Sequence, residues 1–473
     1  MSDADGGPDL LLRVRRGSGR PLAAQVEAAL RDAVRDGRLA PGARLPPSRT
    51  LARDLGVSRR LVVGAFEQLA SEGWLEARVG AGTFVRRTLP AGRDAPPADG
   101  APAPPAAARP GVPDVPYDFF AGHPDLGGFP RAAWARAVRD ALTTLPDAAL
   151  GYGDGRGLAE LRTELAAFLA RSRGVVADPG RIVVCQGAVQ ALGLVARALG
   201  PGARIAVEDP CLPEHRRVLA AQGADVVPVP VDELGVRDQA VRRAGAAAAL
   251  LTPAHQMPTG VALAAGRRAA LATWAREAGT LLVDDDYDAE FRYDRSAPSA
   301  LQALAPDAVA YLGSASKVLA PALRLAWLVV PAGRLDAVVA AKRFADGGSP
   351  VLEQAALARL LASGALERHL RGARRRHGAR RAALVRAVAQ HLPEAEVTGI
   401  AAGLHAVVRL PRAVPARPVA LAARAAGVGV YPLSFSYADP PPETSALVLG
   451  YGALSPAAIH EGIRRLATVL PSL

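Results

Sequence analysis

The chain has 473 residues and a formal net charge of +12, a length that predicts two or three domains and a charge that favours a polyanionic partner. Hydrophobic residues make up 50% of the chain and aromatic residues only 4%, so we expect a large core built mostly from Ala, Val and Leu. Charged residues, Gly or Pro interrupt every apolar run before it reaches membrane-spanning length, and the N-terminal segment lacks the apolar stretch of a signal peptide, so we expect a cytoplasmic protein without a membrane partner.

Residues 20–87 carry the pattern of a small helical domain followed by a hairpin. Apolar residues recur at helical spacing between Pro21 and Gly37, which predicts a first helix. Ser48 and Ser58 are predicted to cap a second and a third helix, with a tight turn at LGVS between them. The segment WLEARVGAGTFVRR then alternates around a glycine turn, as a β-hairpin does.

A short helix, a tight turn and a longer helix form the helix-turn-helix pattern, in which the last helix lays its first turn in the major groove of DNA. This pattern predicts that Ser58 and the two arginines after it lie at base edges or phosphates, since arginine can fork onto guanine. The predicted DNA-contacting residues are Arg49, Ser58, Arg59 and Arg60 on the helices and Gly82 and Thr83 at the hairpin tip. The alternative is a solvated helical domain whose arginines only face water.

Three stretches in this region, PGARLPPSRTLARDLGVSRRLV, LASEGWLEAR and GAGTFV, resemble the GntR-type winged helix in their order and spacing. The resemblance covers nearly all of residues 20–87 and implies binding to double-stranded operator DNA as a dimer. The family usually continues its recognition helix as Ser-Arg-x-Thr-Val, whereas this chain has Arg60, Leu61 and Val62. The base sequence that the helix reads is therefore left open.

Residues 88–115 are mainly Pro, Ala and Gly, so they predict an extended, semi-rigid linker. A structureless loop of this length inside one domain would be unusual. We therefore expect a flexible N-terminus over residues 1–19, a DNA-binding domain over 20–87 and a second domain over 116–473. Cys185 and Cys211 form neither a disulfide framework nor a metal-ligand spacing, so we expect no metal.

Short apolar runs in residues 116–473 alternate with helix-length segments. The runs are RIVVCQG, RIAVED, AALLTP, TLLVDDDYD, AVAYLGS and RLAWLVV. Apolar strands separated by helices indicate a mainly parallel, doubly wound α/β sheet. Ligand-binding groups gather at the carboxyl ends of the strands in such sheets, and the chemically suggestive clusters of this chain follow these runs.

Two of these strand ends predict binding of a charged ligand. Gly187 and Ala188 begin a helix directly after a strand, and backbone N–H groups at a helix start bind phosphate. Another strand ends in Asp284, Asp285 and Asp286. A carboxylate buried there needs a cationic partner or a ligand N–H, whereas a solvated acidic loop would explain one or two of the three.

Lys317 is one of only two lysines in the chain, although Lys and Arg together number 57. A guanidinium stays protonated in proteins, so an amine that attacks a carbonyl has to come from lysine. Ser314 precedes Lys317 in GSASK and Arg324 follows one loop later, and a hydroxyl with a guanidinium suits a phosphate. An aldehyde for the amine, a phosphate, and a ring nitrogen for a carboxylate together describe pyridoxal 5'-phosphate (PLP).

Four stretches, YGDGRGLAELR, TPAHQMPTG, VDDDYDAEFRY and GSASKVLAPALRLAW, resemble the fold-type-I aminotransferase superfamily in their order. Together with the winged helix, they make the whole chain similar to MocR-type bacterial transcription regulators. The resemblance implies a PLP-dependent transferase-like major domain with a small C-terminal α/β subdomain, assembled as a homodimer.

The resemblance also implies a role for each matched residue. Lys317 would form the internal aldimine, Asp285 would pair with the pyridinium nitrogen, and Tyr287 would bond the phenolic oxygen of the ring. The cofactor phosphate would be held by Gly187, Ala188, Ser314 and Arg324, with Tyr152 reaching the phosphate of the partner subunit's cofactor and His255 lying beneath the ring.

Three departures from the superfamily pattern affect the amino-acid site. Met257 replaces the usual asparagine before PTG, so a neighbour in HQMPTG would have to make its contact. After EDP, Leu212 and Glu214 stand where the family often has a ring-stacking tyrosine and an arginine. Near the C-terminus, Val448 replaces the arginine that clamps the substrate carboxylate. The cofactor site therefore looks intact, whereas the amino-acid site looks dismantled.

We expect a homodimeric transcription regulator that senses PLP or an amino compound, and whether it also turns over a substrate stays open. One alternative is a working aminotransferase whose N-terminal domain only localises it. Another is a plain DNA-binding repressor with a decayed, cofactor-free sensor. The missing arginine argues against the first alternative, and the retained Lys317, Asp285 and Arg324 argue against the second.

Overall fold

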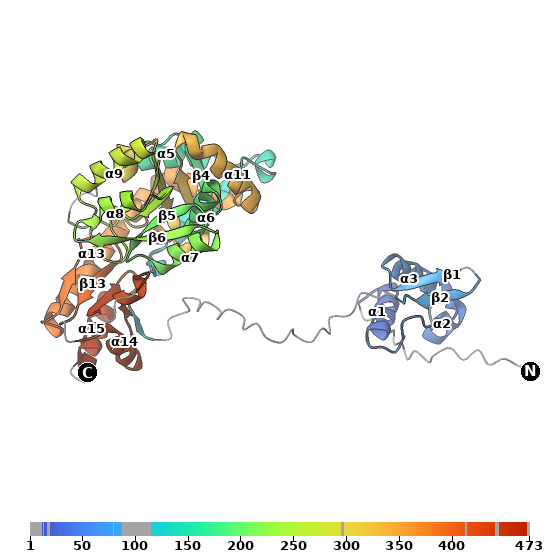
Figure 1. Cartoon of the computed structure of the whole chain (residues 1–473). Coiled ribbons are helices and arrows are strands. Elements are labelled where there is room, and N and C mark those ends of the chain that lie inside the picture. The colour runs from blue at the N-terminus through green and yellow to red at the C-terminus, as the bar shows by residue number, and fades with distance from the viewer. Residues whose placement is uncertain are drawn as a thin grey trace, which may run out of the picture. The chain divides into compact units, whose positions relative to one another are not determined.

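The structure, a computed structural model, describes residues 12, 14–16, 19–78, 80–87, 115–294, 298–411, 414–439 and 444–470. Nearly all of the expected linker and most of the expected flexible N-terminus lie outside these residues. The chain separates into two compact units, Met1–Arg109 and Pro110–Leu473 (Figure 1).

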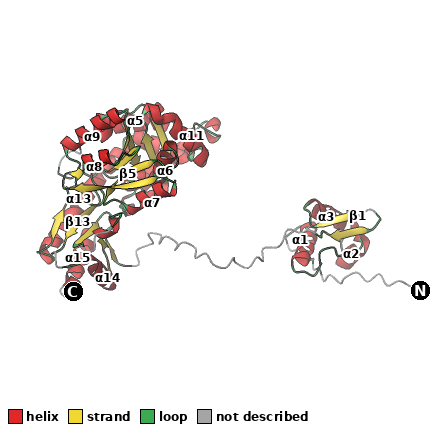
Figure 2. Ribbon diagram, viewed as in Figure 1, coloured by secondary structure: helices red, strands yellow, loops and turns green. Residues whose placement is uncertain are grey.

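The described part of the N-terminal unit contains three helices and a two-stranded hairpin, as predicted (Figure 2). Its elements are α1 (Leu22–Arg35), α2 (Ser48–Leu55), α3 (Arg59–Ser71), β1 (Leu75–Arg78) and β2 (Gly82–Val85). The hairpin is antiparallel, with Leu75 opposite Val85. Both residues belong to the core that joins the three helices, which also includes Val26, Leu30, Leu51, Val62 and Leu69.

The ends of these helices explain where the turn lies. Ser58 precedes α3, and its Oγ accepts a hydrogen bond from Leu61 N at 3.3 Å, as predicted for a cap. Gly56 ends α2 with a φ of 63°, a conformation that glycine adopts without strain. The prediction that Ser48 caps α2 is wrong. Pro47 occupies the cap position, Ser48 is the first helical residue, and no side chain at the cap accepts a hydrogen bond from the first turn.

The second unit is built on an eight-stranded sheet with strand order β4-β11-β10-β9-β8-β5-β6-β7. Its strands are β4 (Ile182–Cys185), β5 (Arg204–Asp209), β6 (Asp225–Asp232), β7 (Gly235–Val236), β8 (Ala248–Leu251), β9 (Leu281–Asp285), β10 (Val309–Ser314) and β11 (Ala326–Val329). The strands from β10 to β6 are mutually parallel. The antiparallel pairs of this sheet are those that β11 forms with β4 and β10 and that β7 forms with β6, so the predicted mainly parallel α/β sheet is confirmed.

Helices cover both faces of this sheet (Figure 1), which is why its strands read as continuous apolar runs. Ile182 and Val184 of β4 pack with α5 and α12, whereas Val183 and Cys185 pack on the other face with α6 and α11. The helices are α4 (Arg131–Thr144), α5 (Ala159–Arg173), α6 (Ala188–Leu199), α7 (Pro213–Ala221), α8 (Asp238–Arg243), α9 (Ala265–Ala278), α10 (Ala315–Val318), α11 (Leu335–Asp346) and α12 (Val351–Ala362). In the described part of the chain, no helix is long and apolar enough to cross a lipid bilayer.

A small C-terminal α/β subdomain completes this unit, as expected. Its antiparallel sheet has the order β12-β13-β16-β15, and a separate parallel pair joins β14 to β3. The strands are β3 (Tyr117–Asp118), β12 (Glu396–Thr398), β13 (His405–Arg409), β14 (Val428–Gly429), β15 (Tyr431–Pro432) and β16 (Ala446–Gly450), and the helices are α13 (Ala365–His391), α14 (Ala416–Ala425) and α15 (Pro456–Val469). Because β3 pairs with β14, the chain enters this unit through its C-terminal subdomain.

The strand β6 is missing from the predicted runs. It contains Pro228 and Pro230, and prolines usually argue against an inner strand because they lack the N–H group. These two prolines are two residues apart, so their missing donors face the same side of the strand. On the side of β7, the register pairs only Val231 and Asp232 of β6 with β7 residues. The prolines therefore need not donate hydrogen bonds to a neighbouring strand on that side.

Candidate functional site

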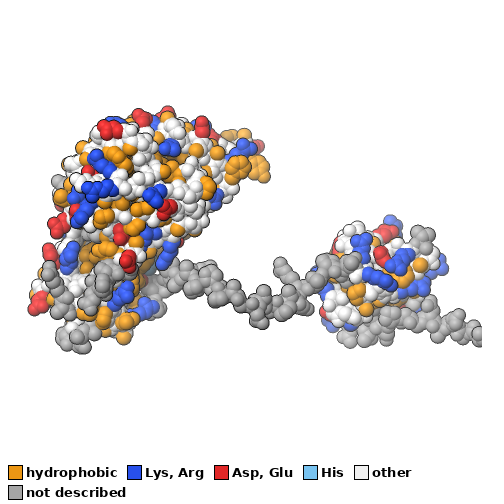
Figure 3. Space-filling model, in the orientation of Figure 1, with side chains coloured by type: hydrophobic (Ala, Val, Ile, Leu, Met, Phe, Trp, Pro, Cys, Tyr) orange, Lys and Arg blue, Asp and Glu red, His pale blue; other side chains and the backbone are white. Residues whose placement is uncertain are grey.

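The residues predicted to contact DNA lie on the surface of the N-terminal unit. Arg59 and Arg60 open α3, Arg49 lies in the first turn of α2, and all three side chains are exposed. Residues 20–87 contain twelve arginines and seven carboxylates, a net charge of +5. Figure 3 shows basic side chains spread over the visible face of this unit. Such a surface attracts the phosphates of a nucleic acid.

Glycine shapes the tip of the β1–β2 hairpin. Gly82 is exposed with a φ of 111°, and a Cβ there would lie 3.2 Å from Arg44 Nε, so a larger residue would be strained. Thr83 is half-buried beside it. Arg78 stacks on Phe84, with 4.7 Å between its guanidinium carbon and the ring centroid. An exposed turn flanked by arginines is suited to the predicted approach to a DNA groove.

The strand-end site of the second unit begins at the turn between β4 and α6. Gly187 precedes α6 with a φ of 97° and Ala188 is its first residue, so the first N–H groups of the helix lack partners within it. A Cβ at Gly187 would lie 2.6 Å from Arg324 Nη2, and the same nitrogen donates to Gln186 O at 2.5 Å. Among the described residues other than glycine, Arg324 alone has a positive φ. A helix start and an arginine thus meet at one point, which suits a phosphate dianion.

A partly buried polar network supports this turn. Asp346 Oδ2 accepts hydrogen bonds from Gln186 Nε2 at 3.0 Å and from Gln190 Nε2 at 2.7 Å. The same oxygen accepts from Nζ of Lys342, whose side chain is fully buried in α11. The second lysine of the chain therefore holds the turn before Gly187 in place. The sequence pattern contains no signal for this role, because α11 lies more than 150 residues away.

Lys317 lies in α10, directly after β10. Its Nζ donates to Gly122 O at 2.7 Å. Burial lowers the pKa of this amine, and two nearby aspartates oppose that effect. A lower pKa increases the share of neutral amine, which is the form that attacks a carbonyl. Ser314 caps α10, since its Oγ accepts from Ser316 N at 3.0 Å.

The three aspartates at the end of β9 have different surroundings, although all are buried. Asp284 Oδ2 accepts from Leu301 N at 2.7 Å, so this carboxylate caps the start of a 3-10 helix. Asp286 forms a buried ion pair with Arg173, with 2.6 Å between Oδ2 and Nε. Both carboxylates thus serve the packing of the fold. Asp285 is the one of the three that remains for a ligand.

Asp285 has a neighbour that was not among the predicted residues. His215 Nε2 lies 3.6 Å from Asp285 Oδ2, too far for a strong hydrogen bond. Burial raises the pKa of Asp285 to about 8 and lowers the pKa of His215 to about 4. A carboxylate buried beside a neutral imidazole is stabilised by a ligand cation such as a pyridinium N–H. The histidine in CLPEHR, next to the departures at Leu212 and Glu214, was the available signal.

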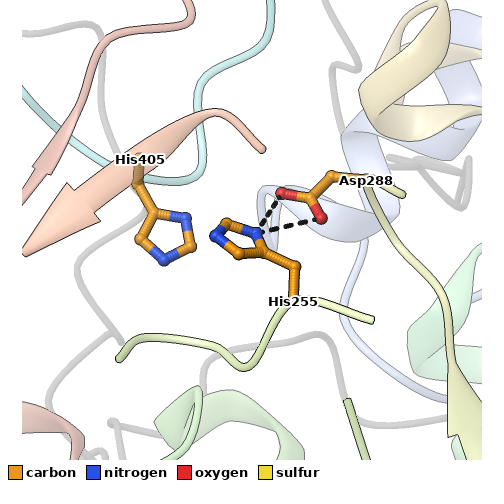
Figure 4. Close-up of side chains that lie close together, drawn as sticks. All are labelled: His255, Asp288 and His405. Carbon is orange, nitrogen blue, oxygen red and sulfur yellow. Dashed lines mark hydrogen bonds and ion pairs between the residues drawn. The ribbon is translucent and has the colours of Figure 1, made fainter. Parts of the chain in front are cut away.

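Tyr287 and His255 join two neighbouring strand-end loops. Tyr287 Oη donates to His255 O at 3.0 Å. The ring of His255 faces Asp288, with Nδ1 at 3.0 and 3.2 Å from the two carboxylate oxygens (Figure 4). His405 of β13 lies beside that ring, and the two ring centroids are 4.8 Å apart. The backbone of His255 thus positions the Tyr287 hydroxyl, while its side chain also contacts Asp288 and His405.

Two of the three positions at which the chain departs from the aminotransferase pattern lie close together in the structure. Leu212 and Met257 line one small cavity, together with His215. The neighbouring Gln256 donates from Nε2 to Pro210 O at 2.8 Å, and its Oε1 accepts from the backbone and side chain of Thr259. Its amide is therefore used within the protein and does not replace the missing asparagine.

The third departure lies in an apolar environment. Val448 of β16 is buried in a cluster with Val407, Leu433 and Ala446. Glu214, the acidic residue at the second departure, is exposed and lies 3.7 Å from Arg217. A buried valine among aliphatic side chains offers no counter-charge to a carboxylate.

Tyr152 is fully exposed, in the loop before α5. Asp154 anchors this loop through ion pairs with Arg156 at 2.7 Å and Arg162 at 3.2 Å. Further large apolar side chains are exposed on this unit, among them Leu126, Leu142, Leu150, Val189 and Phe344. Figure 3 shows apolar side chains gathered at the end of the unit that carries α11. Exposed apolar groups gathered in this way are typical of a surface that contacts another protein.

The strand-end groups fit PLP by their chemistry. An amine of lowered pKa, a buried carboxylate beside a neutral imidazole, and a phenol match the aldehyde, ring nitrogen and phenolic oxygen of that cofactor. The turn at Gly187 and Arg324 matches its phosphate, and any side chain at position 187 would collide there with the guanidinium.

Known protein families match both the N-terminal and the C-terminal part of the chain. The family of class I and II aminotransferases matches residues 118–457, and the gntR family of bacterial regulatory proteins matches residues 22–85. The HTH-type pyridoxine biosynthesis transcriptional regulator PdxR of Corynebacterium glutamicum is 34% identical over 433 residues, 91% of each chain. The probable rhizopine catabolism regulatory protein MocR of Rhizobium meliloti is 31% identical over 477 residues, 98% of this chain and 96% of that protein.

Solved structures confirm the fold of the second unit. The α-aminoadipate aminotransferase LysN of Thermus thermophilus, complexed with N-(5'-phosphopyridoxyl)-L-leucine, has a TM-score of 0.68 and 28% identity, covering 75% of this chain and 92% of that one. The kynurenine aminotransferase of Pyrococcus horikoshii, in complex with PMP, has a TM-score of 0.70 and 26% identity, covering 76% and 91%. The resemblance drawn from the sequence motifs is therefore confirmed at the level of fold.

Proposed function

Because this chain belongs to the aminotransferase class I and II family and carries a DNA-binding domain of the GntR family, we propose that it is a transcription regulator that binds PLP and senses PLP itself or an amine. Two relatives that match over 91% or more of both chains are a transcription regulator and a regulatory protein, which supports a regulatory role. The observation that carries the proposal is the half-buried amine of Lys317, which follows a strand next to the one that ends in Asp285.

The residues of the strand-end site would divide the binding of PLP among them. The cofactor would supply an aldehyde that condenses with amines and a ring that withdraws electrons. Lys317 would hold the aldehyde carbon through Nζ, and Asp285 would keep the ring nitrogen protonated. Tyr287, oriented by the carbonyl of His255, would donate to the phenolic oxygen. The phosphate would be bound by Gly187, Ala188, Ser314 and Arg324.

A homodimer would complete the arrangement. Tyr152 is exposed on an anchored loop, and the exposed apolar side chains of the same unit support a second copy as the partner. In the dimer Tyr152 would reach the cofactor phosphate bound by the other subunit. Two winged helices, each formed by residues 20–87 and tethered through residues 88–115, would then bind two operator half-sites.

DNA binding would respond to the chemistry at Lys317 by a shift of populations. A ligand that binds one arrangement of the dimer more tightly than another favours that arrangement. The winged helices would be placed differently in the two arrangements, so operator affinity changes with the ligand bound.

We expect the effector to be PLP or an amine without a carboxylate next to its nitrogen. Val448 lies among aliphatic side chains, so an α-carboxylate finds no clamp in that region. Transamination needs the substrate held in one orientation, and little turnover of common α-amino acids should therefore occur. A stopped-flow absorbance screen of amines and amino acids, with operator binding measured in parallel, tests this expectation. Rapid conversion of the bound cofactor by several ordinary α-amino acids would identify a working aminotransferase instead.

Alanine at Gly187 should weaken PLP binding. The new Cβ would lie 2.6 Å from Arg324 Nη2 and displace the guanidinium from the turn. Loss of one charge-assisted hydrogen bond, about 1.5–3 kcal/mol, lowers affinity roughly 10- to 150-fold. Gly200→Ala is the matched control, because Gly200 has a φ of 93° at the other end of α6 with nothing within 4 Å of its Cβ. Equal PLP affinities for the two variants in a fluorescence titration would show that the phosphate does not bind at this turn.

A further inference from the structure

Three buried polar side chains meet where the C-terminal subdomain packs against the strand-end loops (Figure 4). His255 lies after β8, Asp288 after β9, and His405 begins β13. Their exposed fractions are 2%, 1% and 1%. One potential ligand atom of each residue lies within 4.8 Å of those of the other two. A cluster assembled from three separate segments has no spacing that a sequence could display.

Hydrogen bonds fix the tautomer of each ring. His255 Nδ1 lies 3.0 Å from a carboxylate oxygen of Asp288, which only accepts, so this nitrogen carries the proton. The Tyr287 hydroxyl is also 3.2 Å from Nδ1, but it donates to the His255 carbonyl. His405 Nε2 lies 3.1 Å from the carbonyl oxygen of Pro258, so it carries the proton of its ring.

The second nitrogen of each ring is left as a buried acceptor. His255 Nε2 and His405 Nδ1 have no hydrogen-bond partner among the described residues. The two rings lie side by side, and Asp288 is on the far side of His255 (Figure 4). A buried acceptor without a partner is costly, and two neighbouring lone pairs also repel each other. A cation between the rings would remove both penalties.

We propose that His255 and His405 bind one divalent transition-metal ion, Zn²⁺ or an ion of the same class, through Nε2 and Nδ1. Neutral imidazole nitrogens suit such ions. Asp288 would hold His255 through its Nδ1 proton and compensate the charge, the arrangement in which a carboxylate orients a metal-binding histidine. The Pro258 carbonyl would orient His405 in the same way. Water or a small ligand would fill the remaining positions.

The ion would link two parts of the second unit. His255 belongs to a loop of the large sheet, whereas His405 belongs to the C-terminal subdomain. The contact is tight, because a Cβ at Gly403 would collide with both His255 and Asp288. An ion that binds only the folded arrangement stabilises it. Zinc should therefore raise the thermal midpoint of the protein, independently of any cofactor or DNA.

Metal uptake by the full-length protein, without an affinity tag and after chelator treatment, tests this site. A second histidine pair has to be removed first, since His391 Nε2 and His460 Nε2 lie 3.2 Å apart near the surface and would also bind zinc. The reference protein is therefore the variant H391Q/H460Q. Zinc retained after equilibrium dialysis is measured by mass spectrometry, and Co²⁺ serves as a probe whose visible absorption reports its ligands.

We expect the reference protein to retain one Zn²⁺ per chain, to gain thermal stability with zinc and to give a Co²⁺ spectrum of nitrogen coordination. Adding H405Q should abolish all three effects, and adding D288N should weaken binding at least tenfold, the usual effect of losing an outer-shell partner. Failure of the reference protein to retain zinc, or equal uptake by the H405Q variant, would overturn the proposal. If a variant does not fold, the Co²⁺ spectrum of the reference protein still shows whether nitrogen atoms bind the ion.

Discussion

Replacing Lys317 by alanine should leave the protein without covalently held PLP. Wild-type protein loaded with PLP and treated with borohydride should carry the cofactor on Lys317 Nζ as a secondary amine. The only other lysine, Lys342, is fully buried and bonded to Asp346 and Ser349, so it should not react. Peptide mass mapping should therefore find one label per chain in the wild type and none in Lys317→Ala.

Lys317→Arg is the matched control, because a guanidinium keeps the positive charge but is no nucleophile at neutral pH. It should lose the label as completely as Lys317→Ala does. The winged helix should stay folded in both variants, since it forms its own core. A label on Lys342 of the wild type, or a label that survives both substitutions, would contradict the assignment of Lys317.

Replacing Arg59 or Arg60 by alanine should weaken specific operator binding by about 1–3 kcal/mol, roughly a 5- to 150-fold loss of affinity. Both side chains are exposed at the start of α3, the position from which a recognition helix contacts base edges. Binding to unrelated DNA should fall less, because it depends on overall charge. Gel-shift titrations with operator and scrambled DNA measure the two affinities.

Arg38→Ala is the charge-matched control for this experiment. Arg38 lies in the turn after α1, is exposed and pairs with Asp36 at 3.3 Å, so its loss removes the same charge from a different surface. Arg38→Ala should lower the affinity for operator DNA and the affinity for scrambled DNA by the same factor. Unchanged operator affinity in both α3 variants, or losses equal to that of Arg38→Ala, would show that the start of α3 does not read the operator.

Much of the fold could be predicted because the large sheet is covered on both faces. Residues on both sides of β4 are buried, so the strand appears in the sequence as the uninterrupted run IVVC. The same architecture explains why the strand-end residues could be named. Asp285 ends β9, Gly187 and Lys317 follow β4 and β10, and these strands lie near one another in the sheet.

The partners of individual side chains could not be predicted. Asp284 and Asp286 are identical residues on either side of Asp285, and only the folded chain shows that one caps a 3-10 helix and the other pairs with Arg173. Arg173 is 113 residues away from its partner. The spacing of residues in a short motif carries no information about contacts between residues so far apart in the sequence. The roles of His405 and Lys342 were missed for the same reason.

Operator affinity measured with and without PLP tests most directly whether chemistry at Lys317 is coupled to DNA binding. The operator can be recovered by selection from random DNA with the full-length protein. Coupling of about 1–3 kcal/mol predicts that saturating PLP changes the Kd of the wild type roughly 5- to 150-fold. In Lys317→Ala the change should be lost or much reduced. A wild-type protein that is saturated with PLP by absorbance, and yet binds its operator with an unchanged Kd, would contradict this account.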